Sequence, residues 1–344
     1  MAEQLNELIA NWHWSALLAT VIVSVLALGK GADWLVEEAV AISLRSGVPR
    51  AIVGATVVSL GTTAPEAAVS VLAALQGNPG LALGNSVGSI ICDTGLILGL
   101  ACLIAPIKFD PAIVNRQGWV QLGCGVLLVA VCFPWSAPAM ALTVGGTMLQ
   151  IAGFVFLGLL VAYIGWSVCM AKSQSADDAP ENLSSHSMVR GILHFLIAIA
   201  IVLVSSSFLI ASATELAERM QIPPAIIAAT LVAFGTSLPE LMIVLTATLK
   251  GHGEIAVGNV IGADILNVLF VAGAAAAVTP AGLHADPAFF RLQFPAMLFV
   301  LFAFRLGIWA ARDGRLSRPL GAFLLLVYVA VTVASFVLVG KVGH

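Results

Sequence analysis

Apolar residues fill the chain in long runs, which are interrupted by glycine, proline or short polar stretches. A helix needs about 20 apolar residues to cross a bilayer, so these runs predict about ten transmembrane helices. We place them at residues 14–46, 49–75, 81–105, 112–133, 139–171, 190–220, 223–249, 254–278, 287–310 and 318–339. The first and sixth runs are long enough for strongly tilted helices. The pattern therefore predicts an all-α integral membrane protein.

Composition supports this interpretation. Hydrophobic residues make up 60% of the 344 residues and charged residues only 10%, whereas a soluble domain carries roughly 25% charged residues. The net charge of −3 and the lack of a basic stripe exclude a nucleic-acid-binding protein. The five cysteines and six histidines show no metal-ligand spacing.

We expect neither a cofactor nor an enzyme active site. An intramembrane protease needs paired aspartates in a Gly-x-Gly-Asp context, or a serine with a histidine inside the membrane, and neither pattern occurs. The sequence therefore argues against an intramembrane protease, which is the class of enzyme that best fits a membrane-spanning chain.

The basic residues predict how the chain is oriented. With both termini outside the cell, 11 of the 15 lysines and arginines flank cytoplasmic loops, as the positive-inside rule requires. We therefore expect a multi-pass protein of the inner (plasma) membrane with both termini extracytoplasmic. Lys30 lies within the first span and is expected to pair with Asp33, one turn away.

An internal repeat divides the chain. Residues 52–99 align without a gap on residues 226–273, with 17 identities in 48 positions. The most specific matches are GTTAPE (61–66) with GTSLPE (235–240), and GNSVGS (84–89) with GNVIGA (258–263). We expect a first five-helix half at 1–171, a cytoplasmic linker at 172–189 and a second five-helix half at 190–344.

An odd number of helices in each half makes the second half enter from the opposite face of the membrane. The two repeats then have inverted topology, which is the arrangement of many transporters that bind their substrate near the membrane midplane.

A stripe of hydroxyl groups and one carboxylate runs along the second and seventh spans. Its members, spaced at i, i+3, i+4 and i+7, are Ser59, Thr62, Thr63 and Glu66 in one span and Ala233, Thr236, Ser237 and Glu240 in the other. A serine or threonine in a membrane helix often only bonds a carbonyl of its own helix. A glutamate within the membrane costs a few kcal/mol and therefore normally has a partner or a function.

Pro65 and Pro239 directly precede these glutamates. Each removes a backbone donor and frees the carbonyl of Gly61 or Gly235, four residues earlier. We therefore expect both helices to break near the midplane and to turn carbonyl oxygens toward a buried cavity.

The third and eighth spans add Ser89 and Asp93, and their counterparts Ala263 and Asn267. Together with the glutamates they predict a midplane cluster of oxygen atoms. Oxygen-only ligation suits a hard cation such as Ca2+ or Na+. Three close carboxylates repel one another unless a cation or protons neutralise them.

At these motifs the chain resembles the cation/calcium exchanger superfamily, in particular its prokaryotic sodium/calcium exchanger family. GTTAPE and GTSLPE, followed by GNSVGS and GNVIGA, are similar to that family's two alpha-repeats, and the likeness extends to GKGADWLV near residues 29–36. The resemblance implies ten helices in two inverted halves. It also implies alternating access, in which the first and sixth helices slide over the other eight.

The resemblance also implies a set of ligands. Glu66 and Glu240 would bind Ca2+ at the centre, with the backbone oxygens of Thr62 and Thr236, while Asp93 and Asn267 would line a middle position. Flanking Na+ sites would use Ser59, Thr62, Thr63 and Glu66 on one side and Ala233, Thr236, Ser237, Glu240 and Ser89 on the other.

The chain departs from the family pattern at four positions. Asp93 and Asn267 are exchanged between the repeats, and Ala263 replaces a hydroxyl residue, so that one Na+ site loses a ligand. Asp264 stands where an asparagine is usual. It either compensates for that loss or faces a neighbouring helix or a headgroup.

These observations predict a secondary antiporter that exchanges Ca2+ for Na+ across the bilayer. A proton-coupled Ca2+ or cation exchanger on the same scaffold is the first alternative, because Ala263 weakens a Na+ site. A cation channel is an alternative from a different class. The sequence leaves the oligomeric state open.

Overall fold

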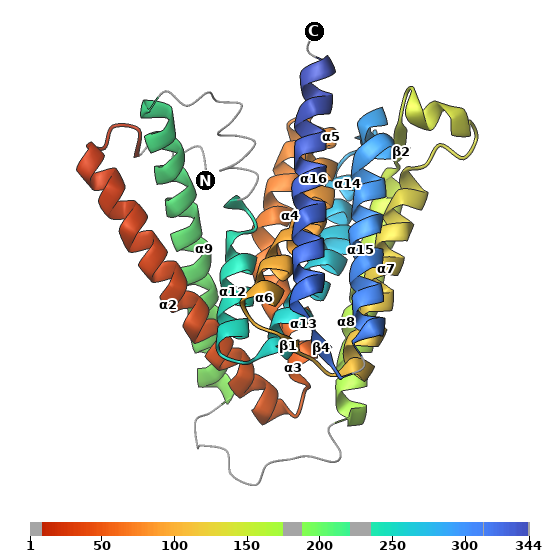
Figure 1. Cartoon of the computed structure of the whole chain (residues 1–344). Helices are drawn as coiled ribbons and strands as arrows, with labels where there is room; N and C mark the ends of the chain where they lie inside the picture. Colours follow the sequence, from red (N-terminus) through yellow and green to blue (C-terminus); the bar gives the residue numbers. More distant parts are fainter. Residues whose placement is uncertain (1–8, 175–187, 221–234, 312, 343–344) are drawn as a thin grey trace.

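The computed structural model describes residues 9–174, 188–220, 235–311 and 313–342. Helices dominate it, and two short two-stranded sheets join the connecting segments. Figure 1 shows the helices side by side in one bundle, with α2 and α9 inclined against the others.

The first half runs from α2 to α8. Its elements are α2 (Trp14–Ser46), α3 (Arg50–Val53), η1 (Gly54–Val58), α4 (Ser59–Leu75), α5 (Pro79–Ile91), η2 (Cys92–Ile97), α6 (Leu98–Ile104), β1 (Ile107–Lys108), α7 (Pro111–Cys132), η3 (Pro138–Leu142), β2 (Gly146–Met148) and α8 (Gln150–Gln174).

The second half follows the same order where it is described. Its elements are α9 (Met188–Arg219), α12 (Leu238–Leu249), α13 (Gly253–Leu266), η5 (Asn267–Ala272), α14 (Gly273–Ala277), β3 (Leu283–Ala285), η6 (Phe289–Gln293), α15 (Phe294–Ala310), β4 (Arg315–Leu316) and α16 (Arg318–Val342).

Eight helices of the described part are long and apolar enough to cross a membrane. They correspond to eight of the ten predicted spans. The other two are α7, a helix of 22 residues, and the seventh span, of which α12 is the described part. The prediction of an all-helical membrane protein is confirmed.

The predicted fifth span, 139–171, begins too early. Residues up to 149 form η3 and β2, and the helix α8 starts only at Gln150. Pro138 opens the short η3 helix, and Gly145 takes a left-handed φ of 94° that ends any regular helix before β2. The hydrophobic run was therefore correctly found, but its first third is a connection.

Two strand pairs join the halves at opposite ends of the bundle. β1 pairs antiparallel with β4, and β2 pairs antiparallel with β3. β1 and β3 both follow the third helix of their half, while β2 and β4 both precede the fifth. Figure 1 places β1 and β4 at the lower end and β2 at the upper end. Equivalent segments thus lie on opposite faces, as inverted topology requires.

Short π-helical turns interrupt the helices at equivalent places in the two repeats. η2 begins at Cys92 and η5 at Asn267, so Asp93 and Asn267 each lie within the first two residues of a π turn. Such turns widen the helix locally and occur frequently at functional sites. The sequence analysis did not predict them.

The expected break at Pro65 is wrong, whereas at Pro239 the described residues show the start of a helix. α4 continues as a helix through Pro65, and the irregular turn is η1, which ends before α4 at Val58. In the second repeat α12 begins at Leu238, with Pro239 in its first turn. A proline is tolerated there because the first-turn N–H groups have no partner within the helix. The two repeats are therefore not identical at this point.

The α13–α14 helix lies at the centre of the bundle. Most of its membrane-spanning window, 89%, is buried, against 11% for the window of α16. Gly258 and Gly262 let it approach α3 and η1, because a Cβ at these positions would overlap the backbone of Ala51 and Ala55. The core is therefore built around a helix of the second repeat that packs on the first.

Lys250 links α2 to the core at the end of α12. Its ammonium group lies 2.8 Å from Glu37 and 3.1 Å from Asp33, both on α2. Burial lowers the pKa of Lys250, but hydrogen bonds to Glu37 and Asp33 outweigh it and raise the pKa. The expected Lys30–Asp33 pair is thus replaced, and Lys30 lies over the Trp34 ring instead.

The close approach of α13 yields a stability prediction. In Gly258→Ala and Gly262→Ala the new Cβ overlaps backbone atoms of Ala51 and Ala55. Overpacking against a backbone that cannot yield should cost about 1–3 kcal/mol. We expect both variants to melt at a lower temperature than the wild type in a thermal-unfolding assay in detergent.

The repeat provides matched controls. The equivalent glycines Gly84 and Gly88 have free space, with one side-chain atom 3.8 Å from a Cβ at Gly84 and none within 4 Å at Gly88. Alanine at these positions should leave the melting temperature unchanged or raise it. Equal stability of Gly258→Ala and Gly84→Ala would contradict the proposed packing.

Candidate functional site

Four acidic residues lie buried in the middle of the helical core. Glu66 comes from α4, Asp93 from η2, Glu240 from α12 and Asp264 from α13, and each is at most 2% exposed. Two come from each repeat. Three of them are the acids that the sequence analysis predicted, and Asp264 is the fourth.

The two glutamates meet across the repeats. The strongest charge interaction of the Glu66 carboxylate is with Glu240, and a weaker one is with Asp93. The hydroxyl of Thr62, one turn before Glu66, contacts the Glu240 carboxylate. Residues that are 174 positions apart in the sequence therefore share one buried location.

Asp93 and Asn267, the equivalent residues of the third and eighth spans, also lie together. The Asn267 amide donates a hydrogen bond of 3.4 Å from Nδ2 to Asp93 Oδ2. The Ser86 hydroxyl donates to the backbone oxygen of Asn267 at 2.6 Å. The middle position is thus lined by one carboxylate and one amide, as the repeat alignment suggests.

The predicted hydroxyl positions divide into three groups. Ser59, Thr62, Thr63, Ser89 and Ser237 are buried, Thr236 is half-buried, and Ala233 lies outside the described residues. The Thr62 hydroxyl also lies 3.2 Å from the carbonyl of Ser59 in its own helix. Ser59 faces α13 at Gly262, and Ser237 contacts the Cys92 thiol.

Several oxygens at this location have no hydrogen-bond partner within the described structure. They are Thr63 Oγ1, Glu66 Oε2, Asp93 Oδ1, Glu240 Oε2, Asp264 Oδ1 and Asn267 Oδ1. A buried polar atom without a partner costs about 1–3 kcal/mol, and a charged one costs more. Each of these oxygens can accept, and the Thr63 hydroxyl can also donate, so a cation is a ligand that would satisfy them together.

Basic side chains do not supply that positive charge. Arg305 is the one buried basic residue of the described part, and it hydrogen-bonds Asn115 and stacks over the Trp119 ring at 4.5 Å. The described residues also contain no group of three or more His, Cys, Asp or Glu side chains that could hold one metal ion. A cation bound here therefore needs hydroxyl, amide or backbone oxygens besides one or two carboxylates.

Asp264 belongs to a polar network that the sequence analysis missed. Its Oδ2 accepts hydrogen bonds from Thr94 Oγ1 at 2.5 Å and from Gln121 Nε2 at 2.6 Å. One turn away on α7, Gln117 accepts a bond of 3.0 Å from Tyr163. Two glutamines four residues apart in an apolar run were the available signal.

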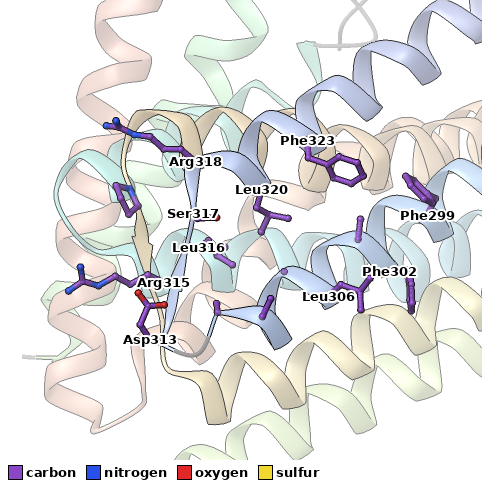
Figure 2. Close-up of a pocket in the computed structure, with 15 residues that line it drawn as sticks. Phe299, Phe302, Leu306, Asp313, Arg315, Leu316, Ser317, Arg318, Leu320 and Phe323 are labelled. Carbon is purple, nitrogen blue, oxygen red and sulfur yellow. The ribbon is translucent and has the colours of Figure 1, made fainter.

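A large cavity lies elsewhere. It has a volume of about 890 Å3 and opens between α15 and α16, with phenylalanines along it and Arg315 and Arg318 at one end. Figure 2 shows Phe299, Phe302 and Phe323 along the cavity. None of the four acids lines it. It plays no part in the candidate site.

Comparison with known proteins identifies the family. The sodium/calcium exchanger protein family matches residues 16–169 and 190–337. The chain belongs to this family. The exchanger resemblance found in the repeat motifs is thereby confirmed.

Individual proteins are similar to this chain over almost its whole length. The chain is 28% identical to the sodium/calcium exchanger MaX1 of Methanosarcina acetivorans, with 92% of this chain and 97% of MaX1 covered. It is 32% identical to the inner membrane protein YrbG of Escherichia coli, with 90% and 94% covered.

A solved structure is also similar. The sodium–calcium exchanger NCX_Mj, soaked with Na+ and Ca2+, is 27% identical and matches with a TM-score of 0.77 over 92% of this chain and 97% of that one. The fold of this exchanger is therefore that of an all-helical membrane exchanger.

The unpaired oxygens yield a binding prediction. We expect millimolar Ca2+ to raise the melting temperature of the detergent-solubilised exchanger, because an ion that binds only the folded state adds about 2.7 kcal/mol at one hundred times its Kd. The double substitution Glu66→Gln/Glu240→Gln should remove this shift. Thermal melts with Ca2+ or with a chelator measure it.

Glu254→Gln serves as the control, since this half-buried glutamate lies in the first turn of α13 and outside the acid group. It should keep the full Ca2+-dependent shift. A shift that survives in the double variant would show that Ca2+ binds somewhere else.

Proposed function

We propose that this protein is an antiporter that exchanges Na+ for Ca2+ across the membrane, with both ions bound among the buried acids. The observation that carries the proposal is the meeting of Glu66 and Glu240, one from each repeat, with an unpaired oxygen on each carboxylate. The names of two similar proteins, the sodium/calcium exchangers MaX1 and NCX_Mj, support it.

Ca2+ is the divalent ion that this ligand set favours. It takes 6–8 oxygen ligands and accepts carboxylates, hydroxyls and carbonyls in flexible geometry. Glu66 and Glu240 would provide the charged ligands, and the backbone oxygens of Thr62 and Thr236 would add neutral ones. The two positive charges of Ca2+ balance the two glutamates.

Na+ would occupy positions that flank and overlap this one. The proposed ligands are Ser59, Thr62, Thr63 and Glu66 on one side, Ala233, Thr236, Ser237, Glu240 and Ser89 on the other, and Asp93 with Asn267 in the middle. Because the same glutamates serve both ions, Na+ and Ca2+ compete, and one load displaces the other.

Alternating access follows from the electrostatics of this competition. Exposing the site to the other face moves the acids through a region of low dielectric constant, which is costly for bare carboxylates and much less so for neutralised ones. The loaded protein can therefore change its conformation, whereas the empty one is held back. Coupled exchange without a leak is the consequence.

Two alternatives make different predictions. A proton-coupled exchanger is favoured by Ala263, which removes the hydroxyl that Ser89 provides in the other repeat. A cation channel would pass Ca2+ without a counter-ion. Both are separated from Na+/Ca2+ antiport in the transport assay below.

In proteoliposomes loaded with Na+, we expect an outward Na+ gradient to drive uptake of labelled Ca2+. Glu66→Gln and Glu240→Gln should each reduce uptake to that of protein-free liposomes, because each removes a charged ligand shared by both ions. Glu254→Gln should transport at the wild-type rate.

The same vesicles test the alternatives. Uptake driven by a pH gradient without Na+ would favour proton coupling, and Ca2+ efflux that needs no external Na+ or Ca2+ would favour a channel. Unchanged uptake in both glutamate variants would overturn the assignment of the site.

We further propose that the halves 1–171 and 190–344 are joined by a cytoplasmic linker at 172–189, in the inner (plasma) membrane with both termini outside the cell. The loop distribution of lysine and arginine supports this orientation. A reporter active only in the cytoplasm should be inactive at the C-terminus and active when inserted at residue 180. The reverse pattern would invert the topology.

A further inference from the structure

The cavity between α15 and α16 has no role in the proposed exchange. Its volume is about 890 Å3, and Phe299 and Phe302 of α15 and Phe323 of α16 lie along it. About half of each of these side chains is exposed. Only 11% of the membrane-spanning window of α16 is buried, so this side of the bundle faces lipid. An apolar hollow in such a wall is suited to an acyl chain.

The length of the cavity matches one leaflet of a bilayer. Its wall on α15 runs from Phe299 to Ala310, a rise of about 16 Å. The hydrocarbon of one leaflet is about 15 Å thick, half of a core of about 30 Å. At one end the Phe299 and Phe323 rings pack against each other, with centroids 6.1 Å apart. The cavity can therefore hold one chain from the membrane surface to about the midplane.

The opposite end of the cavity is basic. Arg315 and Arg318 line it, both are exposed, and Figure 2 shows them at the end away from the phenylalanines. Lys108 is the partner of Arg315 across the β1–β4 ladder. Among the described residues that line the cavity, Asp313 is the one acid, and the ion pairs of the described part include none of these four side chains. Three positive charges therefore stand against one negative charge here.

An anion would stabilise this end. Like charges directly opposite each other on a ladder repel, and Lys108 and Arg315 occupy such a register. α16 begins at Arg318, and the N–H groups of a first helical turn have no partner within the helix and carry partial positive charge. Arginine side chains and helix starts both bind phosphate groups. The anion best suited to this end is therefore a phosphate.

We propose that the cavity binds one anionic phospholipid, with its phosphate at Arg315 and Arg318 and one acyl chain along the three phenylalanines. The excess of positive charge favours an anionic headgroup over a zwitterionic one, and the apolar wall favours a lipid over a free phosphate. In the proposed orientation this end lies at the cytoplasmic surface, where basic pockets between transmembrane helices bind anionic headgroups. The binding does not depend on the proposed exchange, because none of the four acids lines the cavity.

The experiment titrates dioleoyl phosphatidylglycerol, an anionic lipid, into the delipidated full-length protein in detergent. Native mass spectrometry counts the lipids bound per chain. We expect one tight site, which dioleoyl phosphatidylcholine fills much more weakly. Arg315→Gln/Arg318→Gln should weaken the binding of phosphatidylglycerol about thirty-fold, the loss expected for two basic contacts to an anionic headgroup.

Arg116→Gln/Arg190→Gln is the matched control. It removes the same charge from two exposed arginines of α7 and α9 that do not line the cavity, so the affinity should equal that of the wild type. Glu66→Gln/Glu240→Gln should also bind the lipid like the wild type. The result is thereby separate from that of the transport assay.

Leu306→Trp tests the apolar part of the cavity. It narrows the cavity at a half-exposed position of α15 and keeps both arginines, so it should abolish tight binding of phosphatidylglycerol. Unchanged affinity in this variant, or displacement of the lipid by millimolar inorganic phosphate, would indicate an anion site without a lipid and would overturn the proposal.

Other outcomes contradict the proposal in different ways. Equal affinity for the two lipids would show that the headgroup charge is not recognised. Equal affinity of the wild type and Arg315→Gln/Arg318→Gln would place the lipid elsewhere. A dimer mass that excludes the lipid would mean that a second copy of the chain occupies the cavity.

Discussion

A carboxylate inside a membrane bundle must meet positive charge or hydrogen-bond donors, since lipid and apolar side chains offer neither. Here four such groups lie within the core, and Arg305, the buried basic residue of the described part, is engaged with Asn115 and Trp119. The buried negative charge therefore exceeds the buried positive charge, and the surrounding fold reflects this excess. It supplies donors to Asp264 and leaves an oxygen of Glu66 and one of Glu240 unpaired. Cations bound there would compensate the remaining negative charge.

The architecture that brings these acids together depends on close helix packing. Gly258 and Gly262 allow α13 to approach the first repeat, whereas the equivalent Gly84 and Gly88 have space around them. The π turns η2 and η5 occur where Asp93 and Asn267 enter the core. The two repeats therefore share the same arrangement of helices, and local differences between the repeats determine where each charged side chain lies.

Much of this could be predicted from the sequence, because it depends on regular patterns. The hydrophobic runs predicted the helices, and the aligned repeats predicted that Glu66 and Glu240 are equivalent and buried. The predictions failed where geometry depends on tertiary contacts. Pro65 does not interrupt α4, Asp33 pairs with Lys250 instead of Lys30, and residues 139–149 form a connection.

The partners of Asp264 show the same limit most clearly. Thr94 and Gln121 belong to different helices, and although Gln121 with Gln117 marks a polar face on α7, nothing within either helix points to Asp264 as the partner. Only the packing of α7 and η2 against α13 brings them to one carboxylate. A pattern within one helix cannot reveal a network that three helices share.

The two small sheets have a mechanical consequence. Each of them fastens a connection of one half to a connection of the other, one at each end of the bundle. Because hydrogen bonds perpendicular to the strands resist separation, the halves cannot easily swing apart like a hinge at either face. A change of access that leaves these ladders intact has to come from elements outside them. α2 and α9, which lie inclined at the side of the bundle (Figure 1), are long helices that neither ladder borders.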